Sequence, residues 1–218
     1  MFVCGVDEAG RGCVFGPLVV AGVVFDKENI EVLRGIGVKD SKLLTPRERR
    51  EIAEKIKSLA LKFKVVEVSP AEIDSYVLRG KKLRKLNWLE AKVMAKVIEE
   101  LDPDIAYVDA SDINAERFGR WVEEFLTKKI RVVSEHDADR KWLIVGAASI
   151  LAKVHRDKVI GELKTAYGDF GSGYPHDPKT LKFLEEWIKT HKKPPEFARK
   201  SWKTVKKLLS KQEKLKLQ

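Results

Sequence analysis

The sequence predicts an α/β fold in which a mixed sheet is flanked by helices and a helical extension follows at the C-terminal end. Short Val-rich runs bounded by Gly and Pro come first in the chain, which is typical of consecutive strands. Helical patterns then alternate with further short apolar runs, which indicates a sheet covered by helices. Beyond about residue 168 a Gly-rich loop is followed only by helical patterns.

Each element follows from a local signal. Strands are expected at residues 2–6, 18–25, 63–68, 105–108 and 130–133, where β-branched and aliphatic residues cluster. The Thr45-Pro46 pair begins a helix that runs to about residue 61, because Pro suits the first helical position. Apolar residues at three- and four-residue steps predict the other helices, at 86–101, 114–126, 141–167, 178–190 and from 197 to the end.

The charge balance points to a polyanionic partner. The 218 residues carry a formal net charge of +10. The segment 189–218 holds eleven Lys or Arg and two acids, so about nine of the ten net positive charges lie in the last thirty residues. A globular chain with a basic end most often binds nucleic acid.

Several classes of protein are excluded by composition. Two cysteines, Cys4 and Cys13, rule out a disulfide scaffold and a cysteine-based zinc site. The longest uncharged stretch, residues 12–25, is too short to span a bilayer, and Asp7 and Glu8 lie where a signal peptide would be basic. We therefore expect a soluble, cytoplasmic protein without a membrane role, and a monomer by default.

Four acids follow predicted strands and could share one site. Asp7 and Glu8 end the first strand, Asp109 ends the fourth, and Asp139 follows the fifth. The carboxyl ends of strands are where open α/β sheets collect their sites. Converging carboxylates repel one another unless cations are present, and oxygen ligands without His or Cys favour Mg²⁺ or Mn²⁺ over Zn²⁺.

Each acid alone also has a structural interpretation. An Asp after a strand is commonly a turn former or a helix cap. The neighbours Asp7 and Glu8 should point to opposite faces of a strand, so both serve one site only if the strand ends between them. Similarly, Gly10-Arg11-Gly12 would let the backbone approach a ligand while the guanidinium reaches a phosphate, but it could equally be a tight turn with an exposed arginine.

A series of motifs resolves these alternatives by resemblance. It spans nearly the whole chain and consists of residues 7–12 (DEAGRG) with Gly16-Pro17, 40–46 (DSKLLTP), 86–90 (LNWLE), 107–110 (YVDA), 136–139 (HDAD), 147–157 (AASILAKVHRD), 171–175 (GSGYP) and 199–203 (RKSWK). In content and order the series is similar to ribonuclease HII, and to archaeal members of that family in particular.

The resemblance implies a ribonuclease H fold with a five-stranded mixed sheet, in a catalytic domain 1–168 and a helical, basic, substrate-binding extension 169–218. It implies hydrolysis of the RNA strand of RNA/DNA hybrids and cleavage at ribonucleotides embedded in duplex DNA, leaving 5′-phosphate and 3′-hydroxyl ends. The carboxylates that bind two Mg²⁺ or Mn²⁺ ions in the family match Asp7, Glu8, Asp109 and Asp139. The backbone of Gly10, Arg11 and Gly12 would contact the ribonucleotide 2′-hydroxyl, and Tyr174 would pack on the sugar.

Further substrate contacts are expected from residues inside the matching motifs. These are Ser41, Lys42 and Lys153, with Lys200 at the start of the basic C-terminal segment. Lysines in these places suit phosphate, although a surface lysine is the plain alternative. The tail 215–218 could dock on a replication sliding clamp.

Two other functions stay open at this point. One is a non-catalytic duplex-binding protein that keeps the fold without the activity. The other is a carboxylate–metal enzyme acting on DNA, such as a resolvase or transposase.

Overall fold

The computed structural model describes residues 1–38, 44–79 and 85–216 of the chain. The backbone forms two compact units, each assembled from separate segments. The first contains Met1–Ala9, Val19–Glu67 and Arg84–His155, and the second contains Gly10–Leu18, Val68–Leu83 and Arg156–Gln218. The division at residue 168 stays a prediction. Of the expected site residues, Ser41 and Lys42 lie outside the described part.

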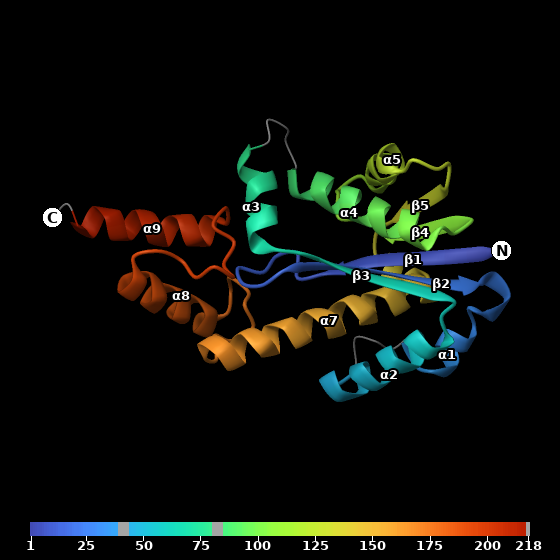
Figure 1. Cartoon of the computed structure of the whole chain (residues 1–218), viewed down its shortest axis with the longest axis horizontal. Coiled ribbons are helices and arrows are strands. Elements are labelled where there is room, and N and C mark those ends of the chain that lie inside the picture. Colours follow the sequence, from blue (N-terminus) through green and yellow to red (C-terminus); the bar gives the residue numbers. More distant parts are fainter. Residues whose placement is uncertain (39–43, 80–84, 217–218) are drawn as a thin grey trace. The chain divides into compact units, whose positions relative to one another are not determined.

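The first unit is built on a five-stranded mixed sheet (Figure 1), which confirms the predicted fold class. Its strand order is β3-β2-β1-β4-β5. The central strand β1 pairs antiparallel with β2 and parallel with β4, and β4 is parallel to β5. The carboxyl ends of β1, β4 and β5 therefore meet at one end of the sheet. The strands are β1 (Phe2–Ala9), β2 (Leu18–Asp26), β3 (Lys62–Val68), β4 (Ile105–Asp109) and β5 (Arg131–Glu135).

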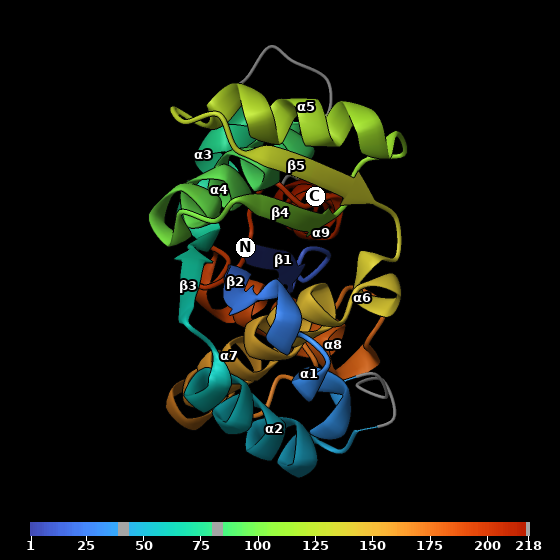
Figure 2. The same cartoon turned by 90° about the vertical axis from the view of Figure 1, so that its right-hand side faces the viewer.

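Helices cover both faces of this sheet (Figures 1 and 2). Helices α4 (Lys85–Leu101) and α5 (Ala115–Phe125) lie on one face, and α2 (Pro46–Leu59) lies on the other with the N-terminal part of α7 (Leu143–Tyr167). Close packing of α7 on β1 requires Gly5, because a Cβ there would lie 2.2 Å from the Ile144 carbonyl oxygen. Three short helical segments complete this unit: η1 (Lys27–Asn29), α1 (Val32–Gly35) and α6 (Ala138–Lys141).

Local signals explain where the helices of this unit begin. Thr45 accepts a hydrogen bond from the backbone of Glu48, whose side chain accepts one from the backbone of Thr45, so the predicted start of α2 is a complete capping box. Asn114 caps α5 by accepting a hydrogen bond from the Arg117 amide.

The second unit has its own aromatic core. The ring centroid of Phe15 lies 5.1 Å from that of Phe170, 5.8 Å from Phe183 and 5.2 Å from Phe197, all in edge-to-face arrangements. Val205 is fully buried in the same cluster. The helices of this unit are α3 (Pro70–Arg79), α8 (Pro178–His191), α9 (Lys203–Lys216) and the rest of α7.

The helix expected from residue 197 begins only at Lys203. Instead, Ala198 forms an antiparallel bridge with Phe15, and the Arg199 amide donates to the Val14 carbonyl at 2.9 Å. These backbone bonds to a distant strand-like segment replace the helical ones, so the prediction for 197–202 was wrong. None of the described helices is long and apolar enough to cross a membrane.

Candidate active site

The predicted carboxylates gather at the carboxyl ends of β1 and β4. Val6 is in register with Val108, so the next residues along the two parallel strands, Asp7 and Asp109, are neighbours. Asp139 lies in the first turn of α6, which follows β5.

Asp7 is the most enclosed of these groups, with 5% of its surface exposed. The Ser149 hydroxyl from α7 donates to its carboxylate, and Lys153 Nζ donates to Ser149 Oγ at 2.7 Å. Burial raises the pKa of Asp7 to about 7, and the charge of Asp109 adds to the rise, while the Ser149 hydrogen bond opposes it. Asp7 is thus held in place but costs free energy when charged.

Asp109 has a similar environment in milder form. Burial raises its pKa, and the negative charges of Asp139 and Asp137 raise it further. Its Oδ1 atom accepts a hydrogen bond from the Ala138 amide at 2.7 Å, which fixes the carboxylate against the start of α6. The effect of Asp109 on the pKa of Asp7 and of Asp139 on the pKa of Asp109 indicates a local excess of negative charge.

Glu8 departs from the simplest form of the prediction. Strand β1 continues through both acids to Ala9, so Asp7 and Glu8 alternate in direction. Asp7 meets Ser149, whereas Glu8 Oε1 accepts a hydrogen bond from Ser111 Oγ at 3.4 Å. In the described part of the chain, no three His, Cys, Asp or Glu side chains are gathered closely enough to form a ready-made metal site.

The chemistry of the donor set nevertheless fits divalent cations. The donors are carboxylate oxygens, which hard cations prefer. Asp7 and Asp109 both have raised pKa values, so a cation bound between them would relieve the cost of their charges. Lys153 lowers the pKa of Asp7 and His136 lowers that of Asp109, but burial outweighs both effects. The basic side chains of α6 lie against other acids, because Arg140 Nη1 is 3.7 Å from Asp137 and Lys141 Nζ is 2.9 Å from Glu135.

The second unit holds the glycine motif in a tight turn. Gly10 has a φ of 82°, and a Cβ there would lie 2.9 Å from the Pro17 carbonyl oxygen, so only glycine fits. The Cys13 amide donates to the Gly10 carbonyl at 3.3 Å, closing the turn. Gly12 is exposed, and the ring of Tyr174 lies 3.9 Å from the place where a Gly12 Cβ would stand. The turn and Tyr174, expected to contact the same sugar, are therefore adjacent.

Arg156 links this turn to the loop of Tyr174. Its Nη2 atom donates to Cys13 Sγ and to the Ser172 carbonyl, both at 3.0 Å, and its guanidinium lies 5.2 Å from the centroid of the Tyr174 ring. Burial raises the pKa of Tyr174 to about 12, with a further rise from Cys13. The tyrosine therefore remains neutral throughout the physiological range.

The predicted lysines have different surroundings. The half-buried Lys153 donates a hydrogen bond to Ser149. The side chain of Lys200 is exposed, while its backbone amide donates to Asp74 Oδ2 at 2.8 Å. Sequence reasoning missed Ser149 and Arg156 as parts of the site. Both lie within the matching motif 147–157, and nothing in a single sequence distinguishes a helix-packing serine from one that holds a carboxylate.

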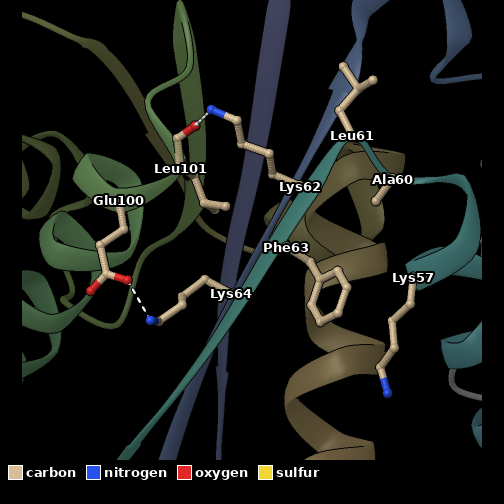
Figure 3. A pocket seen from close by; sticks show the side chains of 8 residues that line it. All are labelled: Lys57, Ala60, Leu61, Lys62, Phe63, Lys64, Glu100 and Leu101. Carbon is tan, nitrogen blue, oxygen red and sulfur yellow. Dashed lines mark hydrogen bonds and ion pairs between the residues drawn. The ribbon is translucent and has the colours of Figure 1, made fainter.

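A separate hollow of about 460 Å³ lies at the other end of the first unit's sheet (Figure 3). In this hollow the Leu61 amide donates to the Val24 carbonyl. Val24 lies near the end of β2, which pairs with the start of β1. The charged groups of the hollow are already paired, because Lys64 Nζ lies 2.5 Å from Glu100 and Lys62 Nζ donates to a backbone carbonyl at 3.0 Å. Its lining residues do not include the carboxylates at the opposite end of β1 and β4.

Solved structures with this fold include a ribonuclease H2 from Pyrococcus horikoshii OT3, with a TM-score of 0.91 and 43% identity over 98% of this chain and 100% of that one. A complex described as PCNA:RNase HII from Archaeoglobus fulgidus has a TM-score of 0.84 and 44% identity, over 93% and 96% of the two chains. A Bst-RNase HIII in complex with Mn²⁺ is only 22% identical, with a TM-score of 0.77 over 98% and 71%, and shows the fold alone. The fold and the acidic strand ends thus define an enzyme of the ribonuclease H class.

Within that class the family is specific. The model of the family described as Ribonuclease HII matches residues 4–205. The ribonuclease HII of Pyrococcus furiosus is 50% identical over 95% of this chain and 91% of its own length. That of Thermococcus sibiricus is also 50% identical, over 98% and 94%. The chain belongs to the ribonuclease HII family.

Proposed function

We propose that this enzyme hydrolyses the RNA strand of RNA/DNA hybrids and cuts at single ribonucleotides embedded in duplex DNA, leaving 5′-phosphate and 3′-hydroxyl ends. The observation that carries the proposal is the pairing of Asp7 with Asp109 at the carboxyl ends of two parallel strands, with Asp139 close enough to affect the pKa of Asp109. Family membership supports the same reaction.

Asp7, Glu8, Asp109 and Asp139 would hold two Mg²⁺ or Mn²⁺ ions. When bound, such a pair activates a water molecule and stabilises the leaving 3′-oxygen of a phosphodiester. Ser149 and the Ala138 amide hold Asp7 and Asp109 in place through hydrogen bonds. No protein nucleophile is required, so the buried Ser149 has a supporting role.

Sugar recognition would come from the second unit. A ribonucleotide differs from a deoxyribonucleotide only by its 2′-hydroxyl, which backbone groups can contact. The exposed Gly12 leaves the backbone of the turn accessible, and the Tyr174 ring beside it offers an apolar face for a sugar. The exposed lysines of α9 would contact backbone phosphates.

The decisive experiment uses a DNA duplex that contains one ribonucleotide. We expect cleavage with Mg²⁺ or Mn²⁺, none with EDTA, and none of an all-DNA duplex. Asp109→Asn should abolish cleavage and leave duplex binding nearly unchanged, because the amide removes a ligand charge without changing the shape. Binding without cleavage by the wild type would favour the non-catalytic reading, and cleavage of the all-DNA duplex would favour a DNA nuclease.

We also propose that the enzyme works with a replication sliding clamp, in the cytoplasm where hybrids form during DNA replication. The support is the Archaeoglobus fulgidus relative, which was solved as a complex with PCNA. Residues 217 and 218 of the expected docking peptide, 215–218, lie outside the described part of the chain. Removing these four residues should abolish stimulation of cleavage by the clamp without changing cleavage by the enzyme alone.

A further inference from the structure

Arg199 lies beneath the glycine turn and is fully buried. Its guanidinium donates three hydrogen bonds to backbone carbonyls of this one segment. Nη2 reaches the Gly10 oxygen at 2.6 Å, Nη1 the Arg11 oxygen at 2.7 Å, and Nε the Gly16 oxygen at 3.1 Å. The Arg199 backbone is itself fixed, because its amide donates to the Val14 carbonyl at 2.9 Å.

These hydrogen bonds determine the orientation of the peptide groups in the turn. In a planar trans peptide the carbonyl of one residue and the amide N–H of the next point in opposite directions. The peptides of this turn are trans. Because the Gly10 and Arg11 carbonyls point at Arg199, the N–H groups of Arg11 and Gly12 point away from it, as two consecutive donors.

We propose that Arg199 is a positioning residue for sugar recognition: it orients the amide groups of Arg11 and Gly12 so that they can donate to a ribonucleotide 2′-hydroxyl. This inference rests on the proposed function and deepens it. The Tyr174 ring, 3.9 Å from the position of a Gly12 Cβ, borders the same backbone. Arg199 does not touch the substrate and acts only through the turn.

The role requires a guanidinium and not merely a positive charge. The planar guanidinium has five N–H donors and can hydrogen-bond to three separated carbonyl oxygens at once. The ammonium group of lysine donates from a single nitrogen atom. The guanidinium also lies 4.9 Å from the centroid of the Trp202 ring, which supports its plane from one side. Lysine at 199 should therefore leave the turn's carbonyls only partly bound, and free the peptides to rotate.

The test measures discrimination between sugars. Wild type, Arg199→Lys and Arg199→Ala would be assayed on duplexes whose junction carries a ribonucleotide or its 2′-fluoro analogue, comparing kcat/KM. We expect the ribonucleotide to 2′-fluoro ratio to fall about 100-fold in both variants, because a misplaced contact costs rates of that order. Methylguanidinium should restore the ratio in Arg199→Ala, and ethylammonium, which carries the same charge, should not.

Arg47→Ala on α2 is the matched control, since that side chain is 84% exposed and pairs with Glu51 of the same helix, and it should leave the ratio unchanged. An unchanged ratio in folded Arg199→Lys would overturn the inference. Loss of folding at 25 °C in both variants would also overturn it, because Arg199 would then hold the whole unit. If the wild type does not cut the ribonucleotide duplex, the proposed function fails instead.

Discussion

The burial of Asp7 makes the stability of the metal-free protein depend on pH. Its pKa is about 7 in the fold, against an ordinary value of 3.8. Between these values the folded protein keeps a proton that the unfolded chain releases, so the contribution of this group to stability is lost as pH rises toward and through 7. A bound divalent cation would remove the penalty by compensating the charge.

We therefore expect Asp7→Asn to stabilise the protein in EDTA more at pH 8 than at pH 5, by about 1–3 kcal/mol, given about 1.4 kcal/mol per pKa unit. Thermal unfolding of both proteins at the two pH values measures the difference. Adding Mg²⁺ at pH 8 should raise the Tm of the wild type more than that of the variant. If Asp7→Asn stabilised the protein equally at both pH values, the result would contradict the free-energy cost assigned to burying the charged Asp7.

The hydrogen bond from Lys153 to Ser149 leads to a second prediction at this scale. Lys153→Gln should reduce cleavage through the orientation of Asp7, while the slope of log affinity against log salt stays unchanged. If Lys153 instead contacts a phosphate, as the sequence suggested, the slope should fall by about 0.9. Ser149→Ala should show the same catalytic loss, and the double variant should lose little more, because residues in one network are not additive.

Single residues were predictable where their chemistry is local. The tight turn at Gly10 and the positions of Asp7 and Asp109 toward the carboxyl ends of their strands follow from residue type and pattern. The supporting contacts were not predictable, because they join residues far apart in the chain. Ser149 reaches Asp7 because α7 packs closely on β1 at Gly5. No local sequence pattern encodes this contact between two distant segments.

Helix α9 has separate apolar and basic faces. Val205 is buried in the aromatic core of the second unit, whereas Lys203, Lys206 and Lys207 are exposed. Replacing these three lysines by Gln should weaken duplex binding at low salt and reduce the salt slope by about 2.7, at about 0.9 per phosphate contact. Fluorescence anisotropy with a labelled hybrid between 50 and 200 mM KCl, about the range in which such contacts dominate, measures both quantities.

The control carries the same change in charge on another helix. Arg47, Arg50 and Lys55 are exposed on α2, and their replacement by Gln should leave the salt slope within about 0.5 of the wild-type value. Equal losses in both triple variants would mean that overall charge, and not α9, drives binding.

Elements with capping signals and clear periodicity were predicted within a few residues. Strand β5, expected at 130–133, runs from Arg131 to Glu135, and α8 ends within one residue of its expected end. The prediction of a helix at 197–202 was wrong because the backbone groups of this segment bond to residues 14–16. A periodic pattern cannot reveal such bonds. Sequence reasoning also missed helix α3. Its buried Asp74 accepts hydrogen bonds from the amides of Lys200 and Ser201, which lie more than 100 residues further along the chain.

Over the whole chain, we expect the basic groups to supply most of the binding affinity and the acidic groups to supply catalysis. The net charge is +10, concentrated in the last thirty residues, while the carboxylates lie at the ends of β1 and β4 in the other compact unit. Affinity for a polyanion comes chiefly from counterion release by lysines and arginines, which requires no bound metal. Cleavage requires the carboxylates and the cations that they would hold.

Metal removal should therefore separate the two properties. In EDTA we expect cleavage of the ribonucleotide-containing duplex to stop, while its affinity falls less than about tenfold and its salt slope is retained, because the lysines still displace counterions. The modest loss reflects repulsion between phosphate and the uncompensated charges of Asp7 and Asp109. Anisotropy of the wild type with and without Mg²⁺, on the all-DNA duplex that it is not expected to cut, measures the difference. A loss of several orders of magnitude would show that the cations, and not the basic C-terminal region, hold the duplex.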